Sequence, residues 1–337
     1  MDNSPISVAD VKDHLSTTGI NSRSIELICG ARAKGTYDQY DVYLRQFSTF
    51  CLDNSIPPRD PTLDDIINFL QVLIDRKLAY TTVNTARSAL SYYFTYFKGV
   101  EVGKIPLVCA LLDGYAREHP PTPKYVLTWD VNILLNKFRL MQGNSNLDLN
   151  ILSFKTVTLL SITTAARGQA IHDFCISRAT WEQDRVAFLL SKPMKNFVKG
   201  APLETVTIYK FQADRKICPY RALKEYLYRT KTIRGQLDCV WISLSEPHRP
   251  IGVQTLHNWI KNMLQSAKIV GYGGHTTRHA ATSMASLLKL SVETIILRGR
   301  WSNCQTFAKF YQKSIESDRV FQDAILNNSV DKSKTKK

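Results

Sequence analysis

The chain has 337 residues, enough for two domains of about 150 residues each. Hydrophobic residues make up 44% and charged residues 22%, an ordinary globular composition that excludes an intrinsically disordered protein. Lys and Arg outnumber Asp and Glu by 44 to 29, and the resulting net charge of +15 indicates a polyanionic partner. Nucleic acid is the stronger candidate and an anionic membrane surface the weaker one.

The positive charge lies in the second part of the chain. Residues 1–120 hold 12 basic and 14 acidic side chains, a net charge of −2, whereas residues 121–337 hold 32 and 15, a net charge of +17. The stretch from Lys192 to Arg234 alone has 11 basic and 3 acidic residues. We therefore expect the second part to provide most of the contacts to phosphates.

Secretion and membrane insertion are not expected. The first thirty residues contain four acidic side chains and no apolar stretch, and no run of 18 apolar residues could span a bilayer. The seven cysteines are widely spaced and include no C-x-x-C pair, which favours reduced thiols over disulfides or a zinc site. These features predict a protein of the cell interior with no membrane partner.

The first part of the sequence predicts a small helical domain. Residues 1–29 are polar and predict a flexible arm, and residues 30–118 predict helices. The helical patterns begin at Thr36, at Thr62 as an N-cap, and at Thr81 or Thr82 as an N-cap. Residues 119–123 contain three prolines and predict an extended linker between two domains.

The second part, residues 124–326, mixes helical and strand patterns. Two β-branched stretches, Val186 to Leu190 and Thr205 to Tyr209, predict a hairpin whose tip carries three lysines. The helical patterns are Asp130–Leu140, Leu149–Ile162, Pro219–Thr230, Gln254–Ala267, Thr276–Lys289 and Val292–Leu297. Residues 327–337 predict a basic, disordered tail. The expected fold is mainly α with a small antiparallel β-sheet, in two domains.

Two arginine-bearing motifs are candidates for an anion site. His275 and Arg278 follow a glycine-rich stretch and share one face of a helix, so they could clamp a phosphate. The plainer interpretation is that Arg278 pairs with a carboxylate and His275 caps the helix. Arg167 ends an apolar helix between small residues and has room to project into a cleft, although such arginines more often serve a surface pair.

Three further residues are weak candidates individually. Lys195 opens the hairpin turn and could donate a proton, with Lys192 and Lys199 as alternatives, although most hairpin lysines are simply solvated. The indole of Trp301 could donate to a phosphate oxygen, and Tyr311 could act as a nucleophile. Both aromatic residues more often serve packing.

The order Arg, Lys, His-x-x-Arg, Trp, Tyr is far more specific than its parts, and it resembles the tyrosine recombinase (phage integrase) superfamily. The likeness covers nearly the whole chain: residues 30–118 are similar to the helical core-binding DNA-binding domain and the region from 124 onward to the α/β catalytic domain. The motifs Thr-Thr-Ala-Ala-Arg, His-Thr-Thr-Arg-His-Ala and Thr-Phe-Ala-Lys-Phe-Tyr are most like eukaryotic mobile-element recombinases of the Crypton and DIRS type.

The resemblance implies an enzyme that cuts and rejoins double-stranded DNA without metal, cofactor or ATP. Tyr311 would attack the scissile phosphate and form a 3′-phosphotyrosine, while Arg167 and Arg278 would hold its nonbridging oxygens. Lys195 would protonate the leaving 5′-oxygen, and His275 would orient the phosphate or take the tyrosine proton. Trp301 would add an N–H donor. A homotetramer in the synaptic complex is also implied, in the nucleus if the source is eukaryotic and otherwise in the cytoplasm or nucleoid.

Two departures from the family pattern leave questions open. Where the family usually has an acidic residue, three positions after the first arginine, this chain has Ala170. Either another carboxylate such as Asp173 supports the site, or that support is absent. The interval from Trp301 to Tyr311 is ten rather than nine, so Tyr311 could act in cis or in trans. The alternatives are a domesticated, non-catalytic DNA-binding protein, a type IB topoisomerase and, least favoured, a metal-dependent nuclease.

Overall fold

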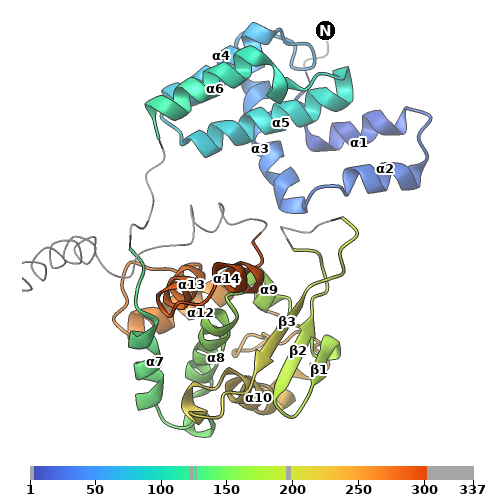
Figure 1. Ribbon diagram of the computed structural model, residues 1–337. Helices are drawn as coiled ribbons and strands as arrows, with labels where there is room; N and C mark the ends of the chain where they lie inside the picture. The colour runs from blue at the N-terminus through green and yellow to red at the C-terminus, as the bar shows by residue number, and fades with distance from the viewer. Residues whose placement is uncertain (1–3, 121–124, 126, 195–198, 302–337) are drawn as a thin grey trace, which may run out of the picture. The chain divides into compact units, whose positions relative to one another are not determined.

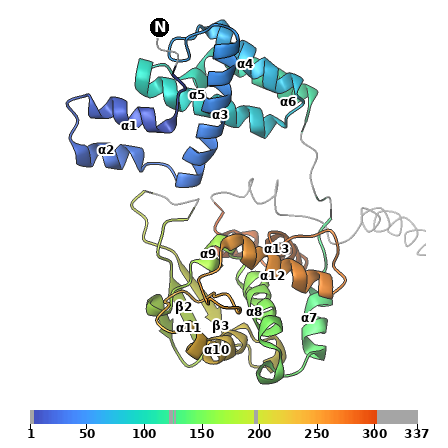
Figure 2. The same cartoon turned by 180° about the vertical axis from the view of Figure 1, so that it is seen from behind.

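The computed structural model describes residues 4–120, 125, 127–194 and 199–301. The chain divides into two compact units, Met1–Lys124 and Tyr125–Lys337, each with its own hydrophobic core. The described elements are mostly helices, and one antiparallel sheet of three strands lies in the second unit (Figures 1 and 2). The predicted fold class, mainly α with a small antiparallel sheet, is confirmed.

The first unit is helical throughout its described residues. Its helices are α1 (Val8–Ser16), α2 (Ser22–Cys29), α3 (Lys34–Asp53), α4 (Leu63–Asp75), α5 (Tyr80–Lys98) and α6 (Pro106–Glu118), with a 3-10 turn at Val102–Lys104. Thr62 caps α4 through a reciprocal bond pair with Asp65, as the sequence predicts. Helix α5 begins earlier than predicted, because Ala79 is its N-cap and makes no side-chain bond. The assignment of Thr81 or Thr82 as that cap is therefore wrong.

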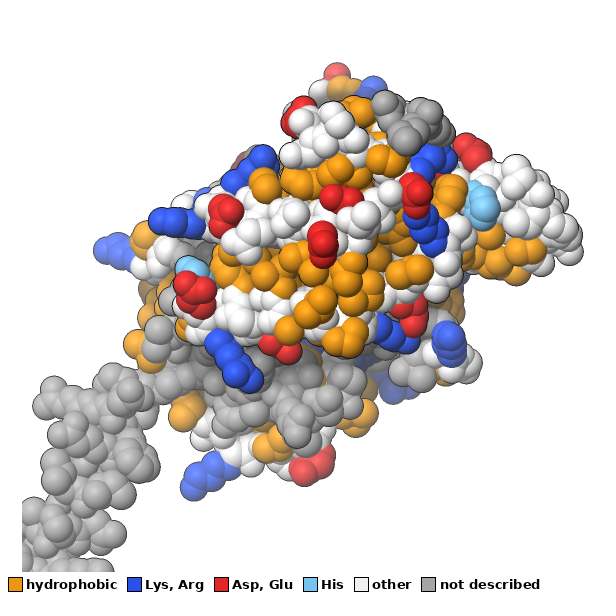
Figure 3. Space-filling view, turned by 90° about the horizontal axis from the view of Figure 1, so that it is seen from above, with side chains coloured by type: hydrophobic (Ala, Val, Ile, Leu, Met, Phe, Trp, Pro, Cys, Tyr) orange, Lys and Arg blue, Asp and Glu red, His pale blue; other side chains and the backbone are white. Residues whose placement is uncertain are grey.

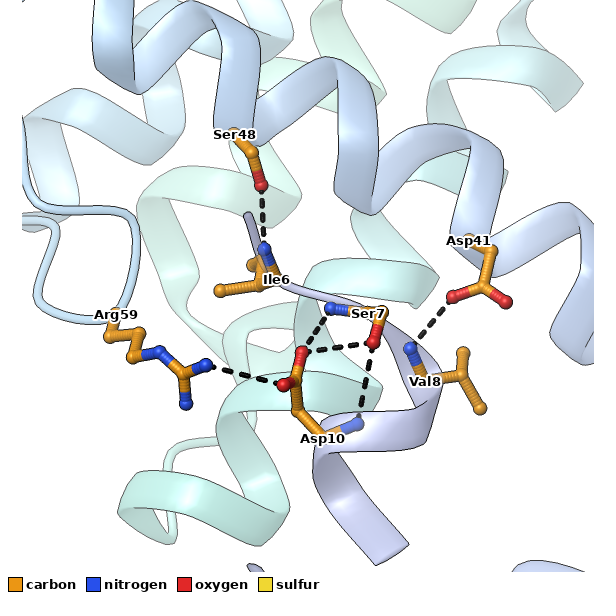
Figure 4. A network of polar contacts seen from close by, with 7 residues as sticks. All are labelled: Ile6, Ser7, Val8, Asp10, Asp41, Ser48 and Arg59. Carbon is orange, nitrogen blue, oxygen red and sulfur yellow. Dashed lines mark hydrogen bonds and ion pairs between the residues drawn. The ribbon is translucent and has the colours of Figure 1, made fainter. Parts of the chain in front are cut away.

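The N-terminal residues do not form the flexible arm that their polarity predicts. Residues 8–16 and 22–29 are helical, and the side chains of Ile6 and Val11 are fully buried in the core of the first unit. Figure 4 shows the polar contacts that fix the start of α1. Ser7 and Asp10 cap each other, the backbone N–H of Ile6 donates to Ser48 Oγ at 2.9 Å, that of Val8 donates to Asp41 at 2.7 Å, and Arg59 pairs with Asp10 at 3.2 Å. Bonds to α3 thus hold a segment whose own composition is polar.

The second unit is built around α8 (Leu149–Thr164), most of whose residues are buried. It packs against α10, α12, α13 and β3. The other helices are α7 (Val131–Leu140), α9 (Gly168–His172), α10 (Pro219–Arg229), α11 (Lys231–Arg234), α12 (Val253–Ser266), α13 (Thr276–Leu287) and α14 (Val292–Gly299), and 3-10 turns lie at Asn144–Asn146, Ile176–Arg178 and Arg215–Ile217. In Figures 1 and 2 α9, α13 and α14 gather at one end of this unit and α10 lies at the other.

The sheet consists of β1 (Ala179–Trp181), β2 (Arg185–Leu189) and β3 (Thr205–Tyr209) in the order β1-β2-β3, with both pairs antiparallel. Val186 pairs with Ile208 and Phe188 with Val206, and these four side chains are buried in the core. Buried residues alternate with more exposed ones along β2 and β3, because successive side chains of a strand point to opposite faces of the sheet. Since β3 pairs with β2 alone, its other edge faces α14.

The surface of the first unit agrees with its near-neutral charge. In the view of Figure 3, hydrophobic side chains are interspersed with Asp, Glu, Lys and Arg. The first 120 residues carry a net charge of −2, so the positive field of the protein comes from the second unit. Among the described helices, none is long and apolar enough to cross a membrane.

The packing of the N-terminal segment gives a first prediction. Ile6→Ala should lower the free energy of unfolding by about 2–5 kcal/mol, because it removes a fully buried side chain from the core. Ile20→Ala is the matched control, because Ile20 is 40% exposed and its replacement should change stability by at most about 0.5 kcal/mol. Urea unfolding followed by circular dichroism measures both. Equal effects would mean that residues 4–16 are loosely held after all.

Candidate functional site

A cavity of about 250 Å³ lies in the second unit, where the end of α8 and the start of α9 face β3 and α14. Its charged lining residues are Arg167, Arg278, Arg298, Arg300 and Glu204. Four guanidinium groups against one carboxylate make the lining strongly cationic. Residues more than a hundred positions apart contribute to it, so the cavity is a product of the tertiary fold.

Arg167 enters this cavity from a sharp turn between two helices. Helix α8 ends where Ala165 adopts a left-handed conformation, with φ 51°, and Arg167 is then the extended N-cap of α9. Within the part of the chain that the structure describes, no group hydrogen-bonds or pairs with the Arg167 guanidinium. Its charge is therefore available to an anion, and the sequence expectation that it projects into a cleft is met in geometry.

Arg278 is buried, with 6% of its surface exposed, and its position is fixed by backbone groups. Its Nη1 donates to the carbonyl of Ala165 at 2.8 Å, and its Nη2 donates to the carbonyl of Gly299. Two backbone carbonyls, one at the end of α8 and one at the end of α14, therefore accept hydrogen bonds from this arginine.

Trp301 packs against the guanidinium of Arg278. The guanidinium carbon of Arg278 lies 4.0 Å from the centroid of the Trp301 ring, a close cation–π contact. Trp301 is 6% exposed and is not among the residues that line the cavity. A methyl group on Gly299 would lie 1.8 Å from the ring, so only glycine fits at that position. In this structure Trp301 contacts the arginine and does not border the cavity.

His275 precedes α13 and is exposed. It is the N-cap of α13 but makes no side-chain cap bond, so a capping role does not explain it. Its imidazole lies against that of His257 on α12, with 3.9 Å between the ring centroids. The start of α13 is held by other contacts: Trp129 donates to Thr276 Oγ1 at 3.0 Å, and Thr276 donates to the carbonyl of Gly273 at 2.7 Å.

The carboxylates near the site serve the hairpin. Asp173 accepts from both the backbone N–H and the hydroxyl of Ser191, each at 2.7 Å, at the end of β2. It is therefore bound to the base of the hairpin and is not part of the cavity lining. The position three residues after Arg167 lines the cavity, and it is occupied by Ala170 and not by a carboxylate. Glu204, at the other base of the hairpin, pairs with Arg300.

Helix α14 is fastened to the open edge of β3 by its own arginines. Arg298 donates to the carbonyl of Thr207 at 3.0 Å, and Arg300 donates to the carbonyl of Thr205 as well as pairing with Glu204. These bonds fix the end of α14, and with it Gly299, against the sheet. Arg298, Arg300 and Glu204 are not in the set that the sequence predicts, although the two arginines flank Gly299, two residues before Trp301.

Two members of the expected set lie outside the described residues, namely Lys195 and Tyr311. The alternative lysines Lys192 and Lys199 are described, and both are exposed. The structure thus brings Arg167 and Arg278 together in one cavity, places Trp301 against Arg278, and places His275 beside His257. Over the same described ranges, no three His, Cys, Asp or Glu side chains converge as a metal site, and the cysteines are free.

Comparisons with known proteins agree with this architecture. Residues 30–104 match the family model of the phage integrase N-terminal SAM-like domain. The fold is similar to that of XerH site-specific recombinase bound to palindromic difH substrate in a post-cleavage complex, with a TM-score of 0.60 and 13% identity over 96% of this chain and 90% of that one. No curated protein sequence matches the chain.

Two further solved structures have the same fold. The Tn1549 transposon integrase in complex with transposon right end DNA gives a TM-score of 0.55 and 10% identity, over 95% of this chain and 100% of that one. A lambda integrase dimer bound to a COC′ core site gives 0.51 and 12%, over 92% and 96%. Residues 30–104 therefore match a phage integrase N-terminal domain, and the fold of the chain is similar to that of these site-specific recombinases and integrases.

The contact between Gly299 and Trp301 gives a second prediction. Gly299→Ala should displace the indole from Arg278 and lower the free energy of unfolding by about 1–3 kcal/mol through overpacking. Near-UV circular dichroism and urea unfolding measure the two effects. Gly252→Ala is the control, since a methyl group there meets nothing within 4 Å and the backbone is extended. An unchanged near-UV spectrum in Gly299→Ala would contradict the placement of Trp301.

Proposed function

We propose that the protein is a site-specific DNA recombinase that cuts and rejoins DNA strands through a covalent phosphotyrosine. The observation that supports it most is the pair Arg167 and Arg278, which line one cavity in a chain with the tyrosine recombinase fold. A guanidinium stays charged at any working pH and donates two parallel bonds to a phosphate. Two of them can hold both nonbridging oxygens and stabilise the added charge of the pentavalent transition state.

The proposed reaction needs no group beyond the chain and the DNA. Tyr311 attacks the scissile phosphate, so a bond forms between its phenolic oxygen and phosphorus while the bond to the 5′-oxygen breaks. Lys195 gives a proton to that leaving oxygen, and His275 orients the phosphate or accepts the tyrosine proton. A 5′-hydroxyl from another strand reverses these steps and regenerates Tyr311. Because the phosphodiester energy is kept in the covalent link, strand exchange needs no ATP.

In this proposal Trp301 acts through Arg278, since its ring lies under the guanidinium. The support that the family takes from an acidic residue is not available at Ala170, and Asp173 is bound to Ser191. The two arginines are instead held by backbone geometry: the turn at Ala165 for Arg167, and the carbonyls of Ala165 and Gly299 for Arg278.

We further propose double-stranded DNA as the partner, a homotetramer on two DNA sites as the active assembly, and movement of a mobile element as the biological role. The basic second unit supports the first point. The likeness of the motifs to Crypton and DIRS recombinases supports the third, and the Tn1549 integrase of similar fold was solved with transposon DNA. Such a protein works where the DNA is, in the nucleus of a eukaryote or in a nucleoid.

The assignment of the nucleophile gives a third prediction. Tyr311→Phe should abolish covalent attachment to a nicked suicide substrate while keeping DNA binding within about threefold, because only the phenolic oxygen is lost. Gel analysis of the denatured adduct and peptide mapping measure the attachment. Tyr272→Phe is the matched control, since Tyr272 stacks on Tyr125 beside the His-x-x-Arg motif and should keep full activity.

The outcomes of this assay separate the candidate functions. An adduct that persists in Tyr311→Phe would refute the nucleophile, and an adduct mapped to Tyr272 would replace it. Binding with no adduct in the unmodified protein would favour a non-catalytic DNA-binding protein. Supercoil relaxation by a monomer, without strand exchange, would favour a type IB topoisomerase.

The charge distribution gives a fourth prediction. If the second unit contacts roughly 6–10 phosphates, DNA affinity should fall about 10³- to 10⁵-fold between about 50 and 200 mM salt, because bound counterions are released. The double variant Lys192→Ala, Lys199→Ala should reduce the slope of log affinity against log salt by about two if both exposed lysines contact phosphates. Fluorescence anisotropy with labelled duplex measures both. A nearly flat salt dependence would contradict a phosphate-based interface.

A further inference from the structure

A histidine outside the expected catalytic set occupies an unusual position. His257 lies in the second turn of α12 and is 7% exposed. A methyl group on Gly168 would lie 2.1 Å from its Nε2, and a methyl group on Gly274 would lie 3.0 Å from its Cα and carbonyl oxygen. The residue is therefore in direct contact with both glycines: a methyl group at Gly168 would overlap the ring, and one at Gly274 would be a tight contact.

These two glycines are the neighbours of candidate catalytic residues. Gly168 follows Arg167 and Gly274 precedes His275, so one residue of α12 separates the two backbone segments that carry them. The His257 ring also lies against the His275 ring, with 3.9 Å between centroids and 52° between planes. The His257 side chain, which belongs to neither segment, thus sets the distance between Arg167 and His275.

His257 makes this contact as a neutral spacer. Its Nε2 is buried, and no hydrogen-bond partner for it occurs within the described ranges. Burial, and then the nearby His275 and His172, lower its pKa from 6.5 to about 4. At neutral pH it adds no charge beside His275 and Arg167, and it fills the space with a rigid ring of two rotatable bonds.

We propose that His257 is a positioning residue that holds Arg167 and His275 at the separation needed to meet one scissile phosphate. This inference rests on the proposed function, and His257 itself contacts no reacting atom. A displacement of about 1 Å in a catalytic group can lower the rate about 10²-fold. A side chain that fixes the spacing of two such groups therefore contributes to the rate. Gly168 and Gly274 complement His257, because the absence of a side chain at each position lets His257 contact the backbone there.

The test compares three variants with the full-length protein. His257→Ala should lower the rate of covalent attachment to nicked DNA by about 10²-fold at saturating DNA, with less than about threefold change in Kd. His257→Gln, a neutral side chain of similar reach, should recover the rate to within about fivefold. His248→Ala is the control, because His248 contacts the carbonyl of Ser243 in the same unit and should leave the rate unchanged.

A double-mutant cycle distinguishes a spacer from general packing. Gly168→Ala should be defective because its methyl group meets Nε2, and this defect should largely disappear in the His257→Ala background, where the imidazole is gone. Additive effects of the two substitutions, or a wild-type rate in His257→Ala, would overturn the proposal. If His257→Ala does not fold, the comparison of His257→Gln with Gly168→Ala gives the same answer.

The proposed function and the spacer role of His257 would fail in different ways. If the unmodified protein forms no adduct with nicked DNA, the proposed function fails. The cycle is then read from urea unfolding, where Gly168→Ala and His257→Ala should still be non-additive if the imidazole is wedged against Gly168. If the unmodified protein forms the adduct and the variants act additively, the recombinase function stands and the spacer does not.

Discussion

One buried guanidinium holds the candidate site together. Arg278 projects from α13, donates to carbonyls at the end of α8 and at the end of α14, and lies on the ring of Trp301. A buried cation is tolerated here because carbonyl oxygens and a ring face supply compensating negative charge. Each buried polar group left without its partner costs about 1–3 kcal/mol, so the three elements depend on this side chain jointly.

Some of the charged residues around the cavity hold the structure together, and another is left to bind a ligand. Arg298 and Arg300 bind carbonyls on the open edge of β3, and Arg300 also engages Glu204, the one carboxylate of the lining. This pairing keeps the carboxylate from neutralising Arg167, whose guanidinium has no described partner. The same bonds cover an exposed strand edge and couple the hairpin to α14. Donors that are fixed before the ligand arrives need no reorganisation when charge develops.

Much of the fold could be predicted because burial leaves a periodic pattern in the sequence. The apolar spacing located α3, α4 and α5, and the β-branched stretches located β2 and β3. The N-terminal helices could not be predicted in this way, since α1 is polar and is held by bonds from Ile6 and Val8 to residues of α3 more than thirty positions away. A contact of that kind has no local signature.

For the site, the sequence by itself determined the residue types and their order: an arginine, a hairpin lysine, His-x-x-Arg, a tryptophan and a tyrosine. It also determined that most of the positive charge lies in the second unit. Only the tertiary structure decided the partners: Arg278 binds carbonyls 113 and 21 residues away, and Asp173 binds Ser191. It also placed His257 between two glycines. The physical reason is that hydrogen bonds and steric contacts are chosen by distance in space, which residue spacing along the chain does not encode at such separations.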